Sequence, residues 1–144
     1  MSITENIAEV RQKIADACLR AGRPEKDVKL IAVTKYVDEE HIAEAFSCGL
    51  KTVGENHAQE VREKLIFYKQ NGAELHFIGQ LQSNKVKYII GNAFLIQSVD
   101  REKLLLEIDS LARKMGAAQS VLLQVNIGNE EQKGGVSVEI CLTY

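Results

Sequence analysis

A short apolar segment that ends on a lysine, Leu30 to Lys35, places the strongest constraint on the fold of this chain. Its residues before the lysine are aliphatic or β-branched, and charged residues flank it, with Lys26 and Asp27 before it and Asp38 to Glu40 after it. This pattern is typical of a short buried parallel strand that leads into a helix. Because ligands bind at the carboxyl ends of such strands, Lys35 stands where chemistry is expected.

The composition predicts a soluble globular protein with no polyanionic partner. The 144 residues are 45% hydrophobic and 26% charged, which fits one compact domain or part of a larger one. A net charge of -2 disfavours nucleic acid and anionic membranes, although the strip Lys85 to Lys87 could hold one phosphate. No apolar run approaches the roughly 20 residues that span a bilayer, and no basic leader precedes an apolar core.

The three cysteines, Cys18, Cys48 and Cys141, are far apart in the sequence and form no CxxC motif. Neither a zinc site nor a disulfide framework is indicated. We therefore expect a protein of the reducing cytoplasm.

Strand and helix patterns alternate along the whole chain. Expected strands cover residues 29–34, 51–53, 75–78, 93–98 and 121–127. The expected helices include one over 2–20 with a Ser2–Glu5 capping box, and others over 38–49, 58–69, 83–90 and 100–116, the last capped by Asp100. A loop follows at residues 128–135, and a further helix begins at Ser137.

This alternation predicts a parallel α/β sheet with right-handed crossovers, in a single domain over residues 1–144. Two arrangements remain open. The five strand–helix units could form a flavodoxin-like open sheet, or they could be the first five of a TIM-type (β/α)₈ barrel of about 250 residues.

Lys35 itself has two interpretations. It could be a solvated lysine at a strand end, or a lysine that forms a Schiff base, because an amine that loses hydration can attack an aldehyde such as that of pyridoxal phosphate. Polar groups also follow the other strands, including Asn56 after the second, Lys85 after the third and Lys133 after the fifth. Asn56 could equally cap a helix, and Lys85 and Lys133 could be ordinary surface lysines.

Four groups of residues resemble motifs of a known protein family. They are Ala32–Lys35, Gly54–Asn56 with Gln59–Glu60, His76–Gly79 with Leu81–Gln82 and Asn84–Lys85, and Asn126–Ile127 with Lys133–Gly135. In this order the chain, from its first helix to about Val138, resembles the pyridoxal phosphate homeostasis protein family, which is similar to the N-terminal domain of alanine racemase.

The resemblance implies a TIM-type barrel that carries pyridoxal 5'-phosphate on Lys35, with Asn56, Lys85 and Lys133 as further cofactor-binding residues. It implies a carrier or regulator of the cofactor without established turnover, whose recipients would be enzymes that depend on pyridoxal phosphate. An amino-acid racemase of the same barrel type is the alternative, but it would need an opposing acid or base. Two histidines have other roles: His76 is expected in the core, bonded to a backbone group, and His57 stands where the family commonly has tyrosine.

The chain also departs from the family. Family members continue through three more strand–helix units, which hold the loops that bind the cofactor phosphate and an arginine that faces the pyridine nitrogen. We therefore expect a truncated, incomplete barrel, and a fragment that binds no cofactor is a further alternative. A shortened reading frame, a cloned fragment and a frameshift would all give such a sequence.

Overall fold

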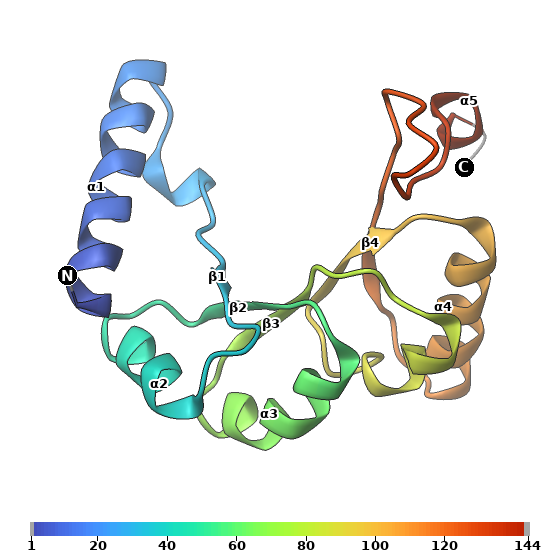
Figure 1. The fold of residues 1–144 in the computed structure, drawn as a ribbon, viewed down its shortest axis with the longest axis horizontal. Coiled ribbons are helices and arrows are strands. Elements are labelled where there is room, and N and C mark those ends of the chain that lie inside the picture. Colours follow the sequence, from blue (N-terminus) through green and yellow to red (C-terminus); the bar gives the residue numbers. More distant parts are fainter. Residues whose placement is uncertain (1, 143–144) are drawn as a thin grey trace.

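Five strands form one parallel sheet in the computed structural model, which describes residues 2–142 (Figure 1). The strands are β1 (Ala32–Val33), β2 (Thr52–Glu55), β3 (Glu74–Phe77), β4 (Leu95–Val99) and β5 (Ser120–Leu123). The α-helices are α1 (Ile3–Ala21), α2 (Glu39–Ser47), α3 (Ala58–Gln70), α4 (Glu102–Lys114) and α5 (Val138–Cys141), and the 3₁₀ helices are η1 (Glu25–Asp27) and η2 (Ser83–Tyr88).

The strand order is β1-β2-β3-β4-β5, with every neighbouring pair parallel. Val53 lies opposite both Ala32 and Leu75, and His76 lies opposite Leu95. A flavodoxin-like sheet would reverse its order around the first strand, so this alternative is wrong. The sequential order confirms the prediction of a partial TIM-type barrel.

The first helix begins as its sequence predicts. The Ser2 side chain accepts a hydrogen bond from the Glu5 amide, and the Glu5 side chain accepts one from the Ser2 amide, which completes the capping box. Gly22 ends the helix in the left-handed conformation, with φ +64°, which glycine adopts without steric cost.

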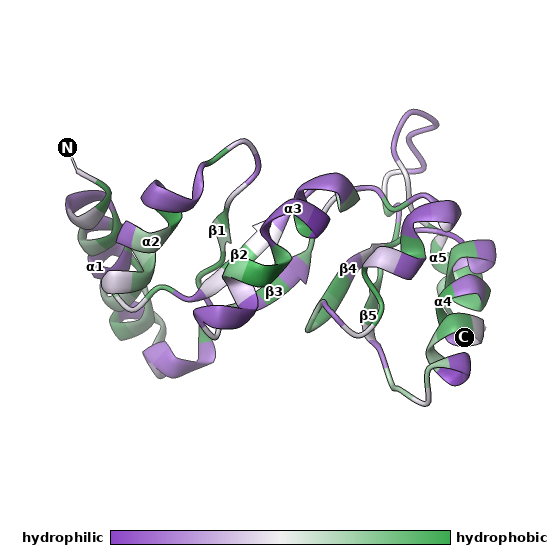
Figure 2. Ribbon diagram, turned by 90° about the horizontal axis from the view of Figure 1, so that it is seen from below, coloured by the Kyte–Doolittle hydropathy of each residue, from purple (hydrophilic) through white to green (hydrophobic). Residues whose placement is uncertain are grey.

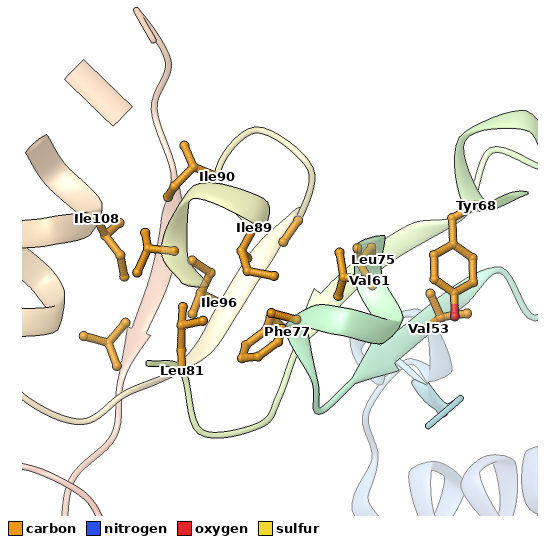
Figure 3. Close-up of a cluster of buried hydrophobic side chains, with 14 of the residues drawn as sticks. Val53, Val61, Tyr68, Leu75, Phe77, Leu81, Ile89, Ile90, Ile96 and Ile108 are labelled. Atoms are coloured by element: carbon orange, nitrogen blue, oxygen red, sulfur yellow. The ribbon is translucent and has the colours of Figure 1, made fainter. Parts of the chain in front are cut away.

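The hydrophobic core lies between the sheet and the helices that follow its strands. Val53, Leu75, Phe77 and Ile96 project from successive strands and meet side chains of α3, η2 and α4 (Figure 3). In Figure 1, α2, α3 and α4 follow one side of the sheet. Figure 2 shows hydrophobic residues on β4 and β5, whereas the outer turns of α4 are hydrophilic. Burial of apolar surface therefore fixes the helices to one face of the sheet.

On the opposite face of the sheet, exposed apolar side chains lie on the two edge strands within residues 2–142. Val33 of β1 is 51% exposed and Leu122 of β5 is 50% exposed. Near the middle of the sheet this face is tightly packed, since a Cβ on Gly54 would lie 2.9 Å from the Ile78 side chain. Such a surface corresponds to the interior of a barrel seen before closure.

Four predicted elements differ from the structure. The first and fifth strands are shorter than expected, because only Ala32–Val33 and Ser120–Leu123 have ladder partners within the described residues. The expected helix over 83–90 is the 3₁₀ helix η2. Asp100 does not cap α4: Arg101 is the N-cap residue, and the Asp100 carboxylate instead pairs with the Arg101 guanidinium.

The C-terminal region follows its prediction as far as it is described. Ser137 caps α5 by accepting a hydrogen bond from the Ile140 amide, and residues 143–144 lie outside the described residues. Within residues 2–142, no helix combines the length and the hydropathy that crossing a membrane requires.

Candidate functional site

Lys35 lies at the carboxyl end of β1, in an exposed turn. The Thr34 amide donates a hydrogen bond to the Gly54 carbonyl at 3.0 Å, and the Val37 amide donates one to the Thr34 carbonyl at 3.1 Å. Within residues 2–142, no hydrogen bond or ion pair engages the Lys35 amine. The backbone around Lys35 is therefore held, whereas its side chain is free.

The turn after β2 lies against the turn after β3. A Cβ on Gly79 would lie 2.0 Å from the Asn56 carbonyl oxygen, so only glycine allows this approach. The Ser98 hydroxyl donates a hydrogen bond to the Gly79 carbonyl and fixes β4 to the same point. Asn56 is not the N-cap of α3, which is His57, and the buried Oδ1 of Asn56 has no hydrogen-bond partner in the described part of the chain. A buried polar atom without a partner is available to a ligand.

A pocket of about 410 Å³ opens beside this contact. Asn56 and Lys85 both line it, together with Arg62 and Tyr88, and Lys35 is not among its lining residues. The Arg62 guanidinium lies 4.5 Å from the centre of the Tyr88 ring, and the Lys85 amine lies 5.9 Å from it. The pocket therefore has a cationic wall, which suits an anionic ligand.

Lys133 belongs to a different pocket. Its amine pairs with Glu130 at 2.7 Å, and it lines a pocket of about 240 Å³ with Asn126. The Asn126 amide holds this loop by donating to the carbonyls of Glu130 and Lys133 at 2.9 and 3.2 Å. The structure thus brings Asn56 and Lys85 together and places Lys133 in another pocket.

A buried polar cluster lies behind the end of β1. Glu55 Oε1 accepts hydrogen bonds from Tyr68 at 2.5 Å, from Thr34 at 2.8 Å and from Lys64 at 3.1 Å. Glu55 is fully buried, and its Oε2 has no partner within residues 2–142. Burial and the hydrogen bond to Glu55 both raise the pKa of Tyr68 well above its ordinary value. Tyr68 therefore stays a neutral donor to the carboxylate.

Lys64 and Glu60 extend this cluster toward the exposed turn. Their side chains pair at 2.8 Å and are 11% and 12% exposed. Burial alone would lower the pKa of Lys64, but its hydrogen bonds to Glu60 and Glu55 outweigh burial and raise the pKa. Burial would likewise raise the pKa of Glu60, but its bonds from Lys64 and the Tyr36 amide lower it. Both residues are thus held in their charged forms.

Sequence reasoning missed Lys64 and Tyr68. The only local signal was the spacing of Glu60 and Lys64, four residues apart on one helix face. That spacing is usually a sign of a solvated surface pair, and nothing local shows that the face points at β1.

His76 is buried, as predicted, but its hydrogen-bond partners are not backbone groups. Its Nε2 lies 2.8 Å from a Glu74 carboxylate oxygen, and its Nδ1 lies 2.9 Å from the Gln97 amide nitrogen. Lys29 also pairs with Glu74. The hydrogen bonds from His76 and Lys29 lower the pKa of Glu74. Among residues 2–142, no three His, Cys, Asp or Glu side chains are grouped so that they could hold a metal ion.

Comparison with known proteins identifies close relatives. A protein from Aquifex aeolicus named pyridoxal phosphate homeostasis protein is 47% identical over 139 residues, which cover 96% of this chain and 61% of the relative. Proteins of the same name from Pasteurella multocida and Escherichia coli are 38% and 34% identical, and each match covers 94% of this chain and 59% of the relative. No protein-family model matches the chain.

Solved structures agree with these relatives. An unknown protein from Bifidobacterium adolescentis superposes with a TM-score of 0.87 at 33% identity, over 98% of this chain and 61% of that one. PipY of Synechococcus elongatus with pyridoxal phosphate bound superposes with a TM-score of 0.71 at 32% identity, over 86% of this chain and 58% of PipY. Together, the motifs, the fold and these identities show that the chain is similar to the proteins named pyridoxal phosphate homeostasis protein, and it spans about three fifths of the length of the curated relatives it matches.

Proposed function

We propose that this chain binds pyridoxal 5'-phosphate covalently through Lys35 and belongs to a protein that carries or regulates this cofactor. The observation that carries the proposal is the position of Lys35, free and exposed at the carboxyl end of β1, in a fold shared with the pyridoxal phosphate-bound PipY. An exposed amine without an ion-pair partner is accessible to an aldehyde, and no carboxylate within residues 2–142 pairs with Lys35. The bound cofactor would supply its aldehyde carbon, which forms a C=N bond to the amine as one water leaves.

The other three candidate residues support binding in different ways. Asn56 presents a buried oxygen that has no hydrogen-bond partner among residues 2–142, and Lys85 adds positive charge to the same pocket. Both groups suit the polar and anionic parts of the cofactor. Lys133, on the separate loop after β5, would serve as a second basic group near the strand ends. We propose Asn56, Lys85 and Lys133 as contributors to affinity and Lys35 as the point of attachment.

The test of attachment is reductive labelling. The chain is mixed with pyridoxal phosphate and treated with borohydride, and its peptides are mapped by mass. The label should lie on Lys35, and both Lys35→Ala and Lys35→Arg should abolish it, because arginine keeps the charge but cannot form the link. A label found mainly on Lys85 or Lys133 would overturn the assignment.

A racemase is the competing function. The relatives are named as homeostasis proteins rather than as enzymes, which favours a carrier without turnover. A racemisation assay on the loaded chain separates the possibilities. Turnover would support the enzyme, a reducible link without turnover supports the carrier, and the absence of both would support a fragment that binds nothing.

The biological role would be to hold the cofactor and release it to enzymes that require it. The three cysteines are free, in accord with a reducing cytoplasmic setting. Mixing the loaded chain with an apo-enzyme that depends on pyridoxal phosphate should restore the enzyme's activity. This transfer should be faster than release of the cofactor into solution.

A further inference from the structure

Two charged side chains of α3 bond to the backbone on both sides of Lys35. The Lys64 amine donates to the Thr34 carbonyl at 2.7 Å, and the Glu60 carboxylate accepts from the Tyr36 amide at 2.8 Å. We propose that the Glu60–Lys64 ion pair is a positioning device for Lys35, which fixes the backbone of this turn so that the amine is presented to the cofactor. This inference rests on the proposed function, since it concerns how the attachment residue is held.

The ion pair is built to resist rearrangement. Both side chains are almost nine-tenths buried, and their mutual contact at 2.8 Å is a charge-assisted hydrogen bond between α3 residues four apart. Lys64 also bonds to the fully buried Glu55, so the pair is anchored to β2 as well. Moving either side chain away would leave the other as an uncompensated buried charge, which is energetically unfavourable. The turn is therefore tied to both α3 and β2.

The backbone at Tyr36 independently indicates that the turn must be held. Its φ is +62°, in the left-handed region that non-glycine residues seldom occupy. Such a conformation persists only when its surroundings fix it. The hydrogen bond from the Tyr36 amide to Glu60 is one such restraint, and the bond between the Tyr36 hydroxyl and His57 Nε2, at 3.1 Å, is another.

The restraint leaves the reactive group untouched. The Thr34 side chain faces α3, where it bonds to Glu55 and Tyr68. Lys35 lies in the turn that follows, where its side chain is exposed and, within residues 2–142, makes no hydrogen bond or ion pair with Glu60 or Lys64. Glu60 and Lys64 thus act on the Lys35 backbone from behind the strand, and neither would touch the cofactor.

The first test measures the backbone directly, without cofactor. Amide hydrogen exchange at Tyr36 is compared in the wild type, Glu60→Gln, Glu60→Ala and Lys64→Met. We expect Glu60→Ala to accelerate this exchange by about tenfold or more, the factor that corresponds to ~1.4 kcal/mol, with Glu60→Gln intermediate because its amide oxygen still accepts. Glu63→Ala is the matched control, because among residues 2–142 the exposed Glu63 carboxylate bonds only to Gln59 on the same helix.

The second test measures the consequence for Lys35. At saturating pyridoxal phosphate, the rate of borohydride labelling at Lys35 should fall about tenfold in Glu60→Ala, less in Glu60→Gln, and not at all in Glu63→Ala. Lys64→Met leaves Glu55 without its cation, so the unfolding transition of this variant is measured first. Its rate of borohydride labelling at Lys35 is then compared with that of the wild type. A loss in apparent affinity with an unchanged saturating rate would overturn the positioning role.

The two tests also separate this inference from the proposed function. If wild-type Lys35 is never labelled, the proposed function fails. The exchange rates at the Tyr36 amide still test whether Glu60 restrains the turn. Unchanged exchange at Tyr36 in Glu60→Ala would overturn the restraint even if Lys35 is labelled normally. Equal acceleration at Tyr36 and at core amides such as those of Val61 and Leu75 would show general destabilisation, which also overturns it.

Discussion

Gly79 lies directly against the Asn56 backbone at the carboxyl ends of β2 and β3: a Cβ on Gly79 would stand 2.0 Å from the Asn56 carbonyl oxygen. This contact locks the turn after β2 to the turn after β3. The obstacle is backbone rather than a flexible side chain, so a substitution cannot be accommodated by a change of rotamer.

We therefore expect Gly79→Ala to lower the free energy of unfolding by at least ~2 kcal/mol, because either the β2 turn or the β3 turn must shift. Chemical denaturation measures this loss. Gly128→Ala is the control, since the atoms nearest its new Cβ belong to the flexible Glu130 side chain, at 3.2 Å and beyond, and the change should alter stability little. Equal effects at the two positions would contradict the packing argument.

Tyr68→Phe should destabilise the chain by about 1–3 kcal/mol, because it removes a hydrogen bond to the fully buried Glu55 carboxylate and leaves the ring in place. Figure 3 shows this ring beside Val53 in the core. Tyr88→Phe is the matched control, because the Tyr88 hydroxyl has no hydrogen bond within residues 2–142. Denaturant titration of the two variants checks the difference, and a neutral Tyr68→Phe would argue against the network.

Acid should weaken the fold partly through Glu74. Hydrogen bonds from His76 and Lys29 lower the folded-state pKa of Glu74 below its ordinary value of 4.5. A lowered folded pKa contributes stability that is fully present above 4.5 and is lost as the pH falls through the folded value. Glu74→Gln should therefore flatten the pH dependence of unfolding below 4.5.

The purified 144-residue chain should self-associate through the open face of its sheet. Val33 and Leu122 are half exposed there, and β5 ends the sheet without a further strand in residues 2–142. Apolar faces and free strand edges favour association. Light scattering should show that Leu122→Lys reduces association, whereas Leu106→Lys, on the outer side of α4, does not.

A related expectation concerns affinity. The chain should bind pyridoxal phosphate more weakly than the Aquifex aeolicus protein, of which it covers 61%, if the remaining part of that relative adds charge-assisted hydrogen bonds to the phosphate, at about 1.5–3 kcal/mol each. Titration of both proteins measures the ratio. A monodisperse monomer that binds with affinity equal to the relative would contradict both this expectation and the preceding one.

The assignment of residues 1–144 to a single incomplete domain stays a prediction, which limited proteolysis would test.

Local signals predicted the helices more accurately than the strands. The capping box at Ser2 and Glu5 is complete within one turn, so α1 could be located from sequence alone. A strand, in contrast, is defined by its ladder partners. Residues 29–31 have a composition that fits a strand, but their backbone has no ladder partner within residues 2–142. Asp100 failed as a cap because Arg101, its neighbour, offered its carboxylate a charged donor.

The candidate site shows the same limit. Lys35 and Asn56 could be chosen because each follows an apolar strand, which is a pattern of neighbouring residues. Lys64 could not be chosen, because its importance comes from a contact with the Thr34 carbonyl thirty residues away. Its buried environment is created by the packing of α3 on β1 and β2, which no sequence period encodes.

The sequential strand order also has a consequence for how the chain acquires its structure. Each strand pairs with the one that precedes it, so the sheet can grow one strand at a time in the direction of synthesis. Contacts between adjacent units, such as Ala32 with Val53, close shorter loops than pairings between distant strands would, which lowers their entropic cost. The end of β1 and helix α3, which together hold Lys35, can therefore assemble before β4 and β5 have left the ribosome.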